Sequence, residues 1–250
     1  MSDPQSSNDR PRLGIDQIST CWVLIRDPVK FVMRYAPAIQ GYLGVFLKNP
    51  HDVEDVCQTF LVRVLERGHV EEERLHGRFR DYLITAVRNA ALTFMRRKPI
   101  GSQDNARLDE IATFDAFEFP GDEEWVSRWR RILLNSVWEA LKQHQRETPG
   151  NLAHTVLRIL ADHPDEDFDT LAVQVSALCG RTIQTPTFRK QVSRARRTFA
   201  GLLVTEVACT MDDPTPLNIE EELIDLDLMK YVRRFLPADW RTSCKLLNAD

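Results

Sequence analysis

The sequence has few of the features that mark membrane-spanning, secreted or disulfide-stapled proteins. Its longest stretch without a charged residue, 35–47, has 13 residues, whereas a membrane span needs about 18 apolar residues. The five cysteines are widely spaced and never form a C-x-x-C pair, which argues against a disulfide framework or a structural zinc site. The polar start MSDPQSSNDRPR does not resemble a secretory signal. We expect a cytoplasmic protein with reduced cysteines and no membrane span.

Catalytic and cofactor-binding motifs are also missing. The six histidines form no H-E-x-x-H pattern, and there is no G-x-S-x-G and no glycine-rich phosphate loop. The acidic stretch DHPDEDFD at 162–169 lacks the glycine and the final glutamate of an EF-hand loop. The sequence therefore predicts a protein that is not an enzyme and that holds no cofactor and no metal.

Strand signals are nearly absent, whereas apolar residues recur at helical spacing throughout, so we expect an all-α fold. The clearest helix covers 52–66 behind the start signal Asn49, Pro50 and Asp52, and a second runs from 79 to 98, before Pro99. Because proline favours the first turn of a helix, 28–36 and 37–47 are expected as two helices. Further helices are expected from 123 to before Pro149 and over 151–162, 167–179 and 185–209.

Charge is distributed in blocks that the net charge of −4 conceals. Residues 77–98 hold six basic residues against Asp81 alone, and 187–200 hold five basic residues and no acid. Residues 99–124 hold eight acids against Arg107, and 205–227 hold eight acids and no base. Such blocks predict two surfaces for a polyanion, and an acidic linker that can fold back and screen them.

Both basic segments have patterns found in nucleic-acid-binding proteins. In 183–203 the apolar positions separate from the basic ones, as in a helix that enters the major groove, and the expected helix ending at Gly180 would complete a helix-turn-helix. Thr185 as N-cap and Pro186 behind it predict the start of this helix. On this segment alone a solvated basic face is an equal alternative. Segment 77–98 mixes basic residues with aromatic ones, which suits single-stranded DNA.

Two stretches together resemble the second conserved region of extracytoplasmic-function sigma factors, small two-domain members of the sigma-70 family. Residues 34–68 carry its Asp-x-x-Gln-x-x-Phe-like core as Asp55, Gln58 and Leu61, and 77–98 resemble the helix that follows, with Tyr82 in place of the usual Trp. VSRARRTFAGLL (192–203) is similar to the fourth region, although Gly180 and Thr185 are farther apart than in the usual pattern. TCWVLIRD and the segment TEVACTMDDPTPLNIEEELIDL resemble a subgroup from planctomycete-like bacteria.

The resemblance implies a domain order and a set of partners. The order is a tail (1–19), a region 2-like domain (20–98), an acidic linker (99–121), a region 4-like domain (122–209) and an acidic helical C-terminal extension (210–250). The partners are core RNA polymerase, through its beta-prime coiled coil and beta flap, promoter DNA, and a regulatory protein such as an anti-sigma factor.

The resemblance also implies three groups of site residues, with the loop 69–78 as a pocket for a flipped base. The polymerase-docking group is Glu54, Asp55, Gln58, Leu61 and Arg63. The minus-10 DNA group is His76, Arg78, Arg80, Tyr82, Arg88, Asn89, Arg96 and Arg97. The minus-35 DNA group is Thr187, Arg189, Lys190, Arg194, Arg196 and Arg197.

Other interpretations remain open at this point. A stand-alone helix-turn-helix regulator would dimerise on a palindromic site. A sigma-like module could bind polymerase without reading promoters, an alternative that the wide Gly180 to Thr185 spacing keeps open. An enzyme ranks third. The apolar positions Ile219, Leu223, Leu226, Met229 and Val232 of the C-terminal segment are expected to pack on the second domain, with binding of a regulator as the alternative.

Overall fold

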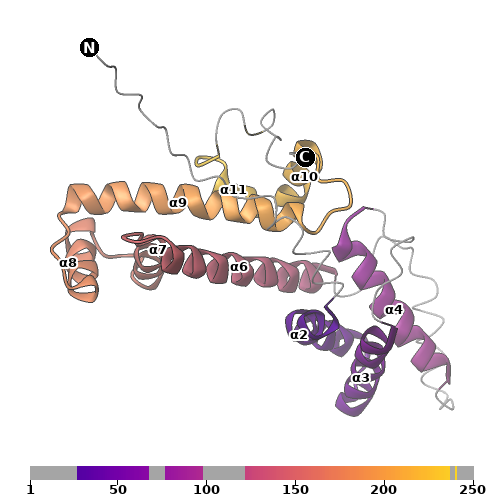
Figure 1. The fold of residues 1–250 in the computed structure, drawn as a ribbon. Coiled ribbons are helices and arrows are strands. Elements are labelled where there is room, and N and C mark those ends of the chain that lie inside the picture. Colours follow the sequence, from indigo (N-terminus) through magenta and orange to yellow (C-terminus); the bar gives the residue numbers. More distant parts are fainter. Residues whose placement is uncertain (1–26, 68–76, 98–121, 237–239, 241–250) are drawn as a thin grey trace.

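The computed structural model describes residues 27–67, 77–97, 122–236 and 240. Every regular element in these ranges is a helix (Figure 1), so the all-α expectation is confirmed. The helices are α2 (Pro28–Phe46), α3 (Pro50–Arg67), α4 (Phe79–Arg97), α6 (Asp122–Glu147), α7 (Ala153–Asp162), α8 (Phe168–Cys179), α9 (Thr185–Ala208), α10 (Pro216–Asp225) and α11 (Met229–Val232).

Helices α2, α3 and α4 form the first helical unit, and α2 supplies its aromatic core. Phe31 and Tyr42 are fully buried, and Phe79 at the start of α4 packs edge-on against Phe31. The expectation of two helices in this stretch is wrong, because α2 continues through Pro37. Proline removes one backbone hydrogen bond from a helix interior. Here buried side chains on both sides of Pro37 hold the two turns on the same core.

Helix α6 joins the first unit to the rest of the molecule. Its Trp129 stacks on Tyr35 of α2, with ring centroids 5.4 Å apart and an interplanar angle of 11°, and its Trp125 packs against Tyr42. Farther along, Leu133 and Val137 remain fully buried. Helix α9 lies alongside α6 in the opposite direction (Figure 1). One continuous apolar core therefore extends from α2 to the C-terminal half of α9.

A smaller cluster of buried residues lies where α7, α8 and α9 meet, around Phe188 and Val175. Gly180 closes α8 in the left-handed conformation, with φ of 62°, as expected for a helix C-cap. The expected N-cap of α9 is off by one residue, because the cap is Gln184. Thr185 donates its hydroxyl hydrogen to Asp169 of α8, so this side chain joins the two helices and caps neither.

The C-terminal helices pack on α9 with their apolar faces inward. Ile219, Leu223, Leu226 and Val232 are buried and Met229 is partly buried, which confirms that this segment packs on the protein. The same segment also reaches the first helical unit. The Phe79 amide donates to the carbonyl of Thr210 at 2.9 Å, and an isolated antiparallel bridge joins Arg78 and Met211. The C-terminal segment therefore contacts both α9 and the start of α4.

Candidate functional site

The outer face of α3 is a polar surface open to solvent. Its inner face carries Val53, Val56 and Cys57, which are at most 8% exposed. Because helix positions three and four apart share a face, burial of these residues turns the opposite side outward. Of the five residues expected to dock polymerase, Glu54, Asp55, Gln58 and Arg63 are exposed and Leu61 is half-buried. We call this surface the α3 face.

Apolar side chains extend the α3 face toward the end of the helix. Val62 and Leu65 are 40% and 43% exposed, which is high for large aliphatic residues. A groove between α3 and α4 is lined by residues that include Arg63, Phe94 and Arg97. Arg63 from the docking group and Arg97 from the minus-10 group thus line the same groove.

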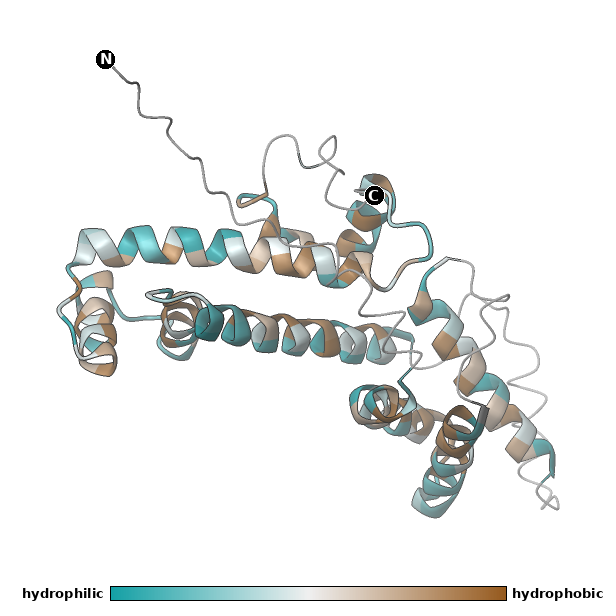
Figure 2. Ribbon diagram, in the orientation of Figure 1, coloured by the Kyte–Doolittle hydropathy of each residue, from teal (hydrophilic) through white to brown (hydrophobic). Residues whose placement is uncertain are grey.

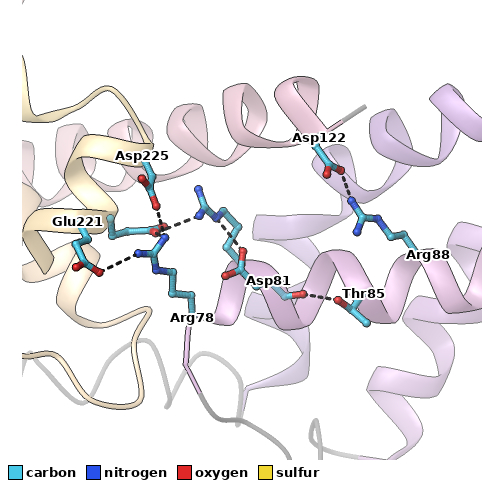
Figure 3. Close-up of polar contacts among 9 residues, drawn as sticks. Arg78, Asp81, Thr85, Arg88, Asp122, Glu221 and Asp225 are labelled. Carbon is cyan, nitrogen blue, oxygen red and sulfur yellow. Dashed lines mark hydrogen bonds and ion pairs between the residues drawn. The ribbon is translucent and has the colours of Figure 1, made fainter. Parts of the chain in front are cut away.

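The N-terminal end of α4 carries two arginines from the minus-10 group, and both are engaged inside the protein (Figure 3). Nη1 of Arg78 lies 3.0 Å from Oε2 of Glu222 and also pairs with Asp225, while its Nη2 lies 3.6 Å from Oε2 of Glu221. Nη2 of Arg80 lies 3.2 Å from the same oxygen of Glu222. Arg80 belongs to the first turn of α4 and Arg78 directly precedes that helix, whereas these three carboxylates belong to α10.

Arg88, in the middle of the same helix, is also engaged within the protein. Its Nε donates a hydrogen bond to the Tyr42 hydroxyl at 2.7 Å, and its guanidinium pairs with Asp122 at the start of α6 (Figure 3). Burial raises the pKa of Tyr42, so the phenol stays neutral and can accept this bond. This trio joins α2, α4 and α6.

The other members of the minus-10 group are divided by position. Tyr82 is half-buried and stacks on Phe79, with ring centroids 6.3 Å apart, while Asn89, Arg96 and Arg97 are exposed. His76 and the loop 69–76 lie outside the described residues. Helix α4 therefore presents exposed basic residues at its C-terminal end and paired ones at its N-terminal end.

The minus-35 group forms one exposed front on α9, and we call this surface the α9 face. All six residues, Thr187, Arg189, Lys190, Arg194, Arg196 and Arg197, are exposed. Phe188, Val192 and Ala195 behind them are at most 3% exposed. Figure 2 shows the resulting contrast, with the N-terminal half of α9 mostly hydrophilic and its C-terminal half more hydrophobic.

The cations of the α9 face are not neutralised within the described part of the chain. No ion pair there joins any of its five basic side chains to a carboxylate. The guanidinium of Arg189 lies 5.7 Å from the ring centroid of Phe168, and that of Arg196 lies 5.8 Å from the ring centroid of Phe235. Such contacts leave the charges available to an anion.

Comparison with protein families agrees with the helical unit built from α2, α3 and α4. In this unit α3 has an exposed polar face, and α4 follows it with basic residues at both ends. Residues 31–99 match the family model described as Sigma-70 region 2. Over these residues the chain is similar to that region, which supports a sigma factor role in RNA polymerase binding and minus-10 promoter recognition.

The remaining comparisons add no named relative. No curated protein and no solved structure matches the chain significantly. None of the described helices is long and apolar enough to cross a membrane. Among the described residues there is also no group of three or more His, Cys, Asp or Glu side chains placed to hold a metal ion.

Sequence reasoning missed the residues that neutralise α4. Glu221, Glu222 and Asp225 belong to the acid-rich block 205–227, but no local pattern indicates which basic segment this block contacts. Tyr42 and Asp122 were missed in the same way, because their link to Arg88 joins positions far apart in the chain.

Proposed function

We propose that this protein is a sigma factor of the extracytoplasmic-function type, which binds core RNA polymerase and directs promoter-specific initiation. The observation that supports this most is the sigma-70 region 2 match, on a helical unit in which four of the five predicted docking residues are exposed on α3. In this proposal the α3 face binds the beta-prime coiled coil, and α4 reads the minus-10 element. The pair α8 and α9 binds the beta flap and reads the minus-35 element.

The α3 face is well suited to dock another helix. Glu54, Asp55 and Gln58 lie next to Val62 and Leu65, so one stripe offers charge, hydrogen bonding and apolar contact. Interfaces gain most of their affinity from a few well-packed residues, and surrounding polar groups fix the register. The α3 face has both kinds of residue within about three helical turns.

Helices α8 and α9 support the minus-35 part of the proposal. A recognition helix needs a packed back and a front of basic residues that reach phosphates and guanine edges. Phe188 and Val192 provide the back, and Arg194 and Arg197 belong to the exposed front. The Ile183 amide donates to Oγ of Ser176 at 2.8 Å, which ties the connecting turn to α8.

The experiment that tests the proposal measures binding of the purified protein to bacterial core RNA polymerase. Asp55→Ala and Gln58→Ala are expected to weaken binding by about tenfold each, the size of a hot-spot truncation. Asp165→Ala removes an exposed carboxylate between α7 and α8 and serves as the control, with unchanged affinity expected.

Two outcomes would contradict the proposal. Tight binding that is insensitive to both substitutions would move the docking surface away from the α3 face. Absence of binding would favour the stand-alone helix-turn-helix regulator, which should then be a dimer in solution and protect a palindromic site.

One observation favours a second candidate, a polymerase-binding module that does not read promoters. Helix α8 ends at Cys179 and α9 begins at Thr185, so the connection is wider than the family's usual turn. Transcription by core polymerase on a library of random promoters separates the two candidates. A sigma factor yields discrete start sites that share a sequence, whereas a binding module yields none.

A further inference from the structure

The acidic face of α10 lies against the basic N-terminal end of α4 (Figure 3). We call its members Glu221, Glu222 and Asp225 the α10 acids. Arg78 is close to all three carboxylates, and Arg80 shares Glu222 with it. The two guanidinium groups thus meet three negative charges from one helix, an arrangement close to the way arginines hold a phosphate.

The pairing is buried at its centre and open at its rim. The Glu222 side chain is 1% exposed and the Arg80 side chain 8%, whereas the side chains of Glu221 and Asp225 are 56% and 48% exposed. Burial raises the pKa of Glu222, because the charged carboxylate loses water there. Apolar side chains of similar volume often stabilise a buried position as well as an ion pair does. Stability alone therefore does not explain why charged residues occupy this position.

Backbone contacts fix the α10 acids in register with α4. The Phe79 amide donates to the Thr210 carbonyl at 2.9 Å, and the Asp212 amide donates to the Gly77 carbonyl at 3.1 Å. Leu223, next to Glu222, is fully buried in the main core. The α10 acids are therefore held against Arg78 and Arg80 before any ligand binds to these arginines.

We propose that the α10 acids occupy the site at which Arg78 and Arg80 would bind a nucleic-acid phosphate, so that the free protein presents α4 masked. The inference rests on the proposed role of α4 in DNA binding. A guanidinium paired with three carboxylates cannot also bind a backbone phosphate with the same nitrogens, so DNA must displace α10 from the arginines. Arg96 and Arg97, at the exposed end of α4, stay available for first contact.

The masking itself is tested without DNA, by the rate at which p-hydroxyphenylglyoxal modifies each arginine in the folded full-length protein, read by mass spectrometry. In the wild type Arg78 and Arg80 should react far more slowly than exposed Arg194. Glu221→Gln/Asp225→Asn should speed modification of Arg78 by about fivefold, and Glu222→Gln by about tenfold, since ion pairs with the guanidinium are lost. Asp213→Asn, on an exposed aspartate outside the ion pairs with Arg78 and Arg80, should change neither rate.

The choice of variants keeps the test informative if burial makes one of them unstable. Glu222 lies in the core, so Glu222→Gln is checked by circular dichroism before use. Glu221 and Asp225 lie at the rim, and their amide replacements are expected to keep the fold. Equal modification of Arg78 in the wild type and in the rim variant would overturn the inference.

A second measurement tests the role of α4 separately. Affinity for a fluorescein-labelled 20-residue thymidine oligonucleotide is measured in an Arg194→Ala/Arg197→Ala background, which weakens the competing α9 face. Adding the rim substitutions should tighten binding by about fivefold, against less than twofold for Asp213→Asn. Faster arginine modification with unchanged affinity would support masking and overturn the DNA role of α4. Unchanged modification would overturn masking, whatever the affinity.

Discussion

Two basic surfaces of similar composition are treated in opposite ways by this fold. At the N-terminal end of α4, Arg78 and Arg80 are paired with carboxylates of α10, and in the middle of the helix Arg88 is paired with Asp122. On the α9 face five basic side chains are exposed, and no carboxylate of the described residues pairs with them. The cations of the first surface are therefore paired with carboxylates, whereas those of the second are exposed and have no carboxylate partner among the described residues.

The difference shows that the acidic block 205–227 pairs with basic residues far from it in the sequence. The acid-rich block 205–227 follows the α9 face directly in the sequence, yet its α10 acids pair with α4. The reason is geometric, because α9 is a straight helix of 24 residues and its C-terminal end lies beside the first helical unit. The α10 acids are thereby brought to Arg78 and Arg80, and no ion pair joins them to the α9 face.

The largest expected effect is on stability, where the two surfaces should differ most. Arg80→Met keeps the apolar length of the side chain but removes one partner of buried Glu222, so the free energy of unfolding should fall by about 2 kcal/mol. Arg194→Met on the exposed α9 face should change it by less than about 0.5 kcal/mol. Urea titration followed by circular dichroism provides the measurement.

A double substitution shows whether the loss comes from the ion pair. Arg80→Met/Glu222→Leu removes both charges and should recover most of the stability lost in Arg80→Met. The reason is that two apolar side chains can be buried without the free-energy cost of removing a charge from water. Equal stability of wild type and Arg80→Met would mean that Arg80 is solvated in solution, and the contrast between the two surfaces would fail.

The next effect concerns binding of duplex DNA. Arg194→Ala/Arg197→Ala should weaken binding by about tenfold at low salt and should reduce the slope of log K against log salt by about 2, one for each lost phosphate contact. Arg78→Ala should alter the slope little while α10 covers this residue. Fluorescence anisotropy of a labelled 30-base-pair duplex over a salt series measures both quantities.

A control variant guards against a general charge effect. Arg146→Ala removes an exposed cation at the end of α6, away from the α9 face, and it should leave the slope unchanged. A slope that responds equally to substitutions on α4 and on α9 would contradict the proposed masking of α4.

The sequence predicted the parts of this structure that depend on local periodicity. Val53, Val56 and Cys57 recur at helical spacing, so the inner side of α3 and its exposed polar face were both predictable. Pro37 shows the limit of a local rule, because the core on both sides of it holds α2 as one helix. The pairing of Arg78 with Asp225 joins residues 147 positions apart and has no periodic or spacing signal.

The smallest expected effect is the loss of stability at acidic pH that comes from His154 in α7, the helix beside α9. The His154 ring packs edge-on against Trp138, with centroids 5.8 Å apart, and burial followed by nearby Lys142 lowers the pKa of His154. Below pH of about 6.5 the unfolded chain binds a proton here more readily than the folded protein does, so stability should fall as pH drops from about 6.5 toward the lowered pKa. Glu222, at the α4 end, has a raised pKa, so its protonation favours the folded state and opposes this loss. The difference in unfolding midpoint between pH 7 and 5.5 should therefore shrink in His154→Gln, a neutral side chain that cannot titrate. An unchanged difference would mean that His154 does not cause the loss of stability at acidic pH.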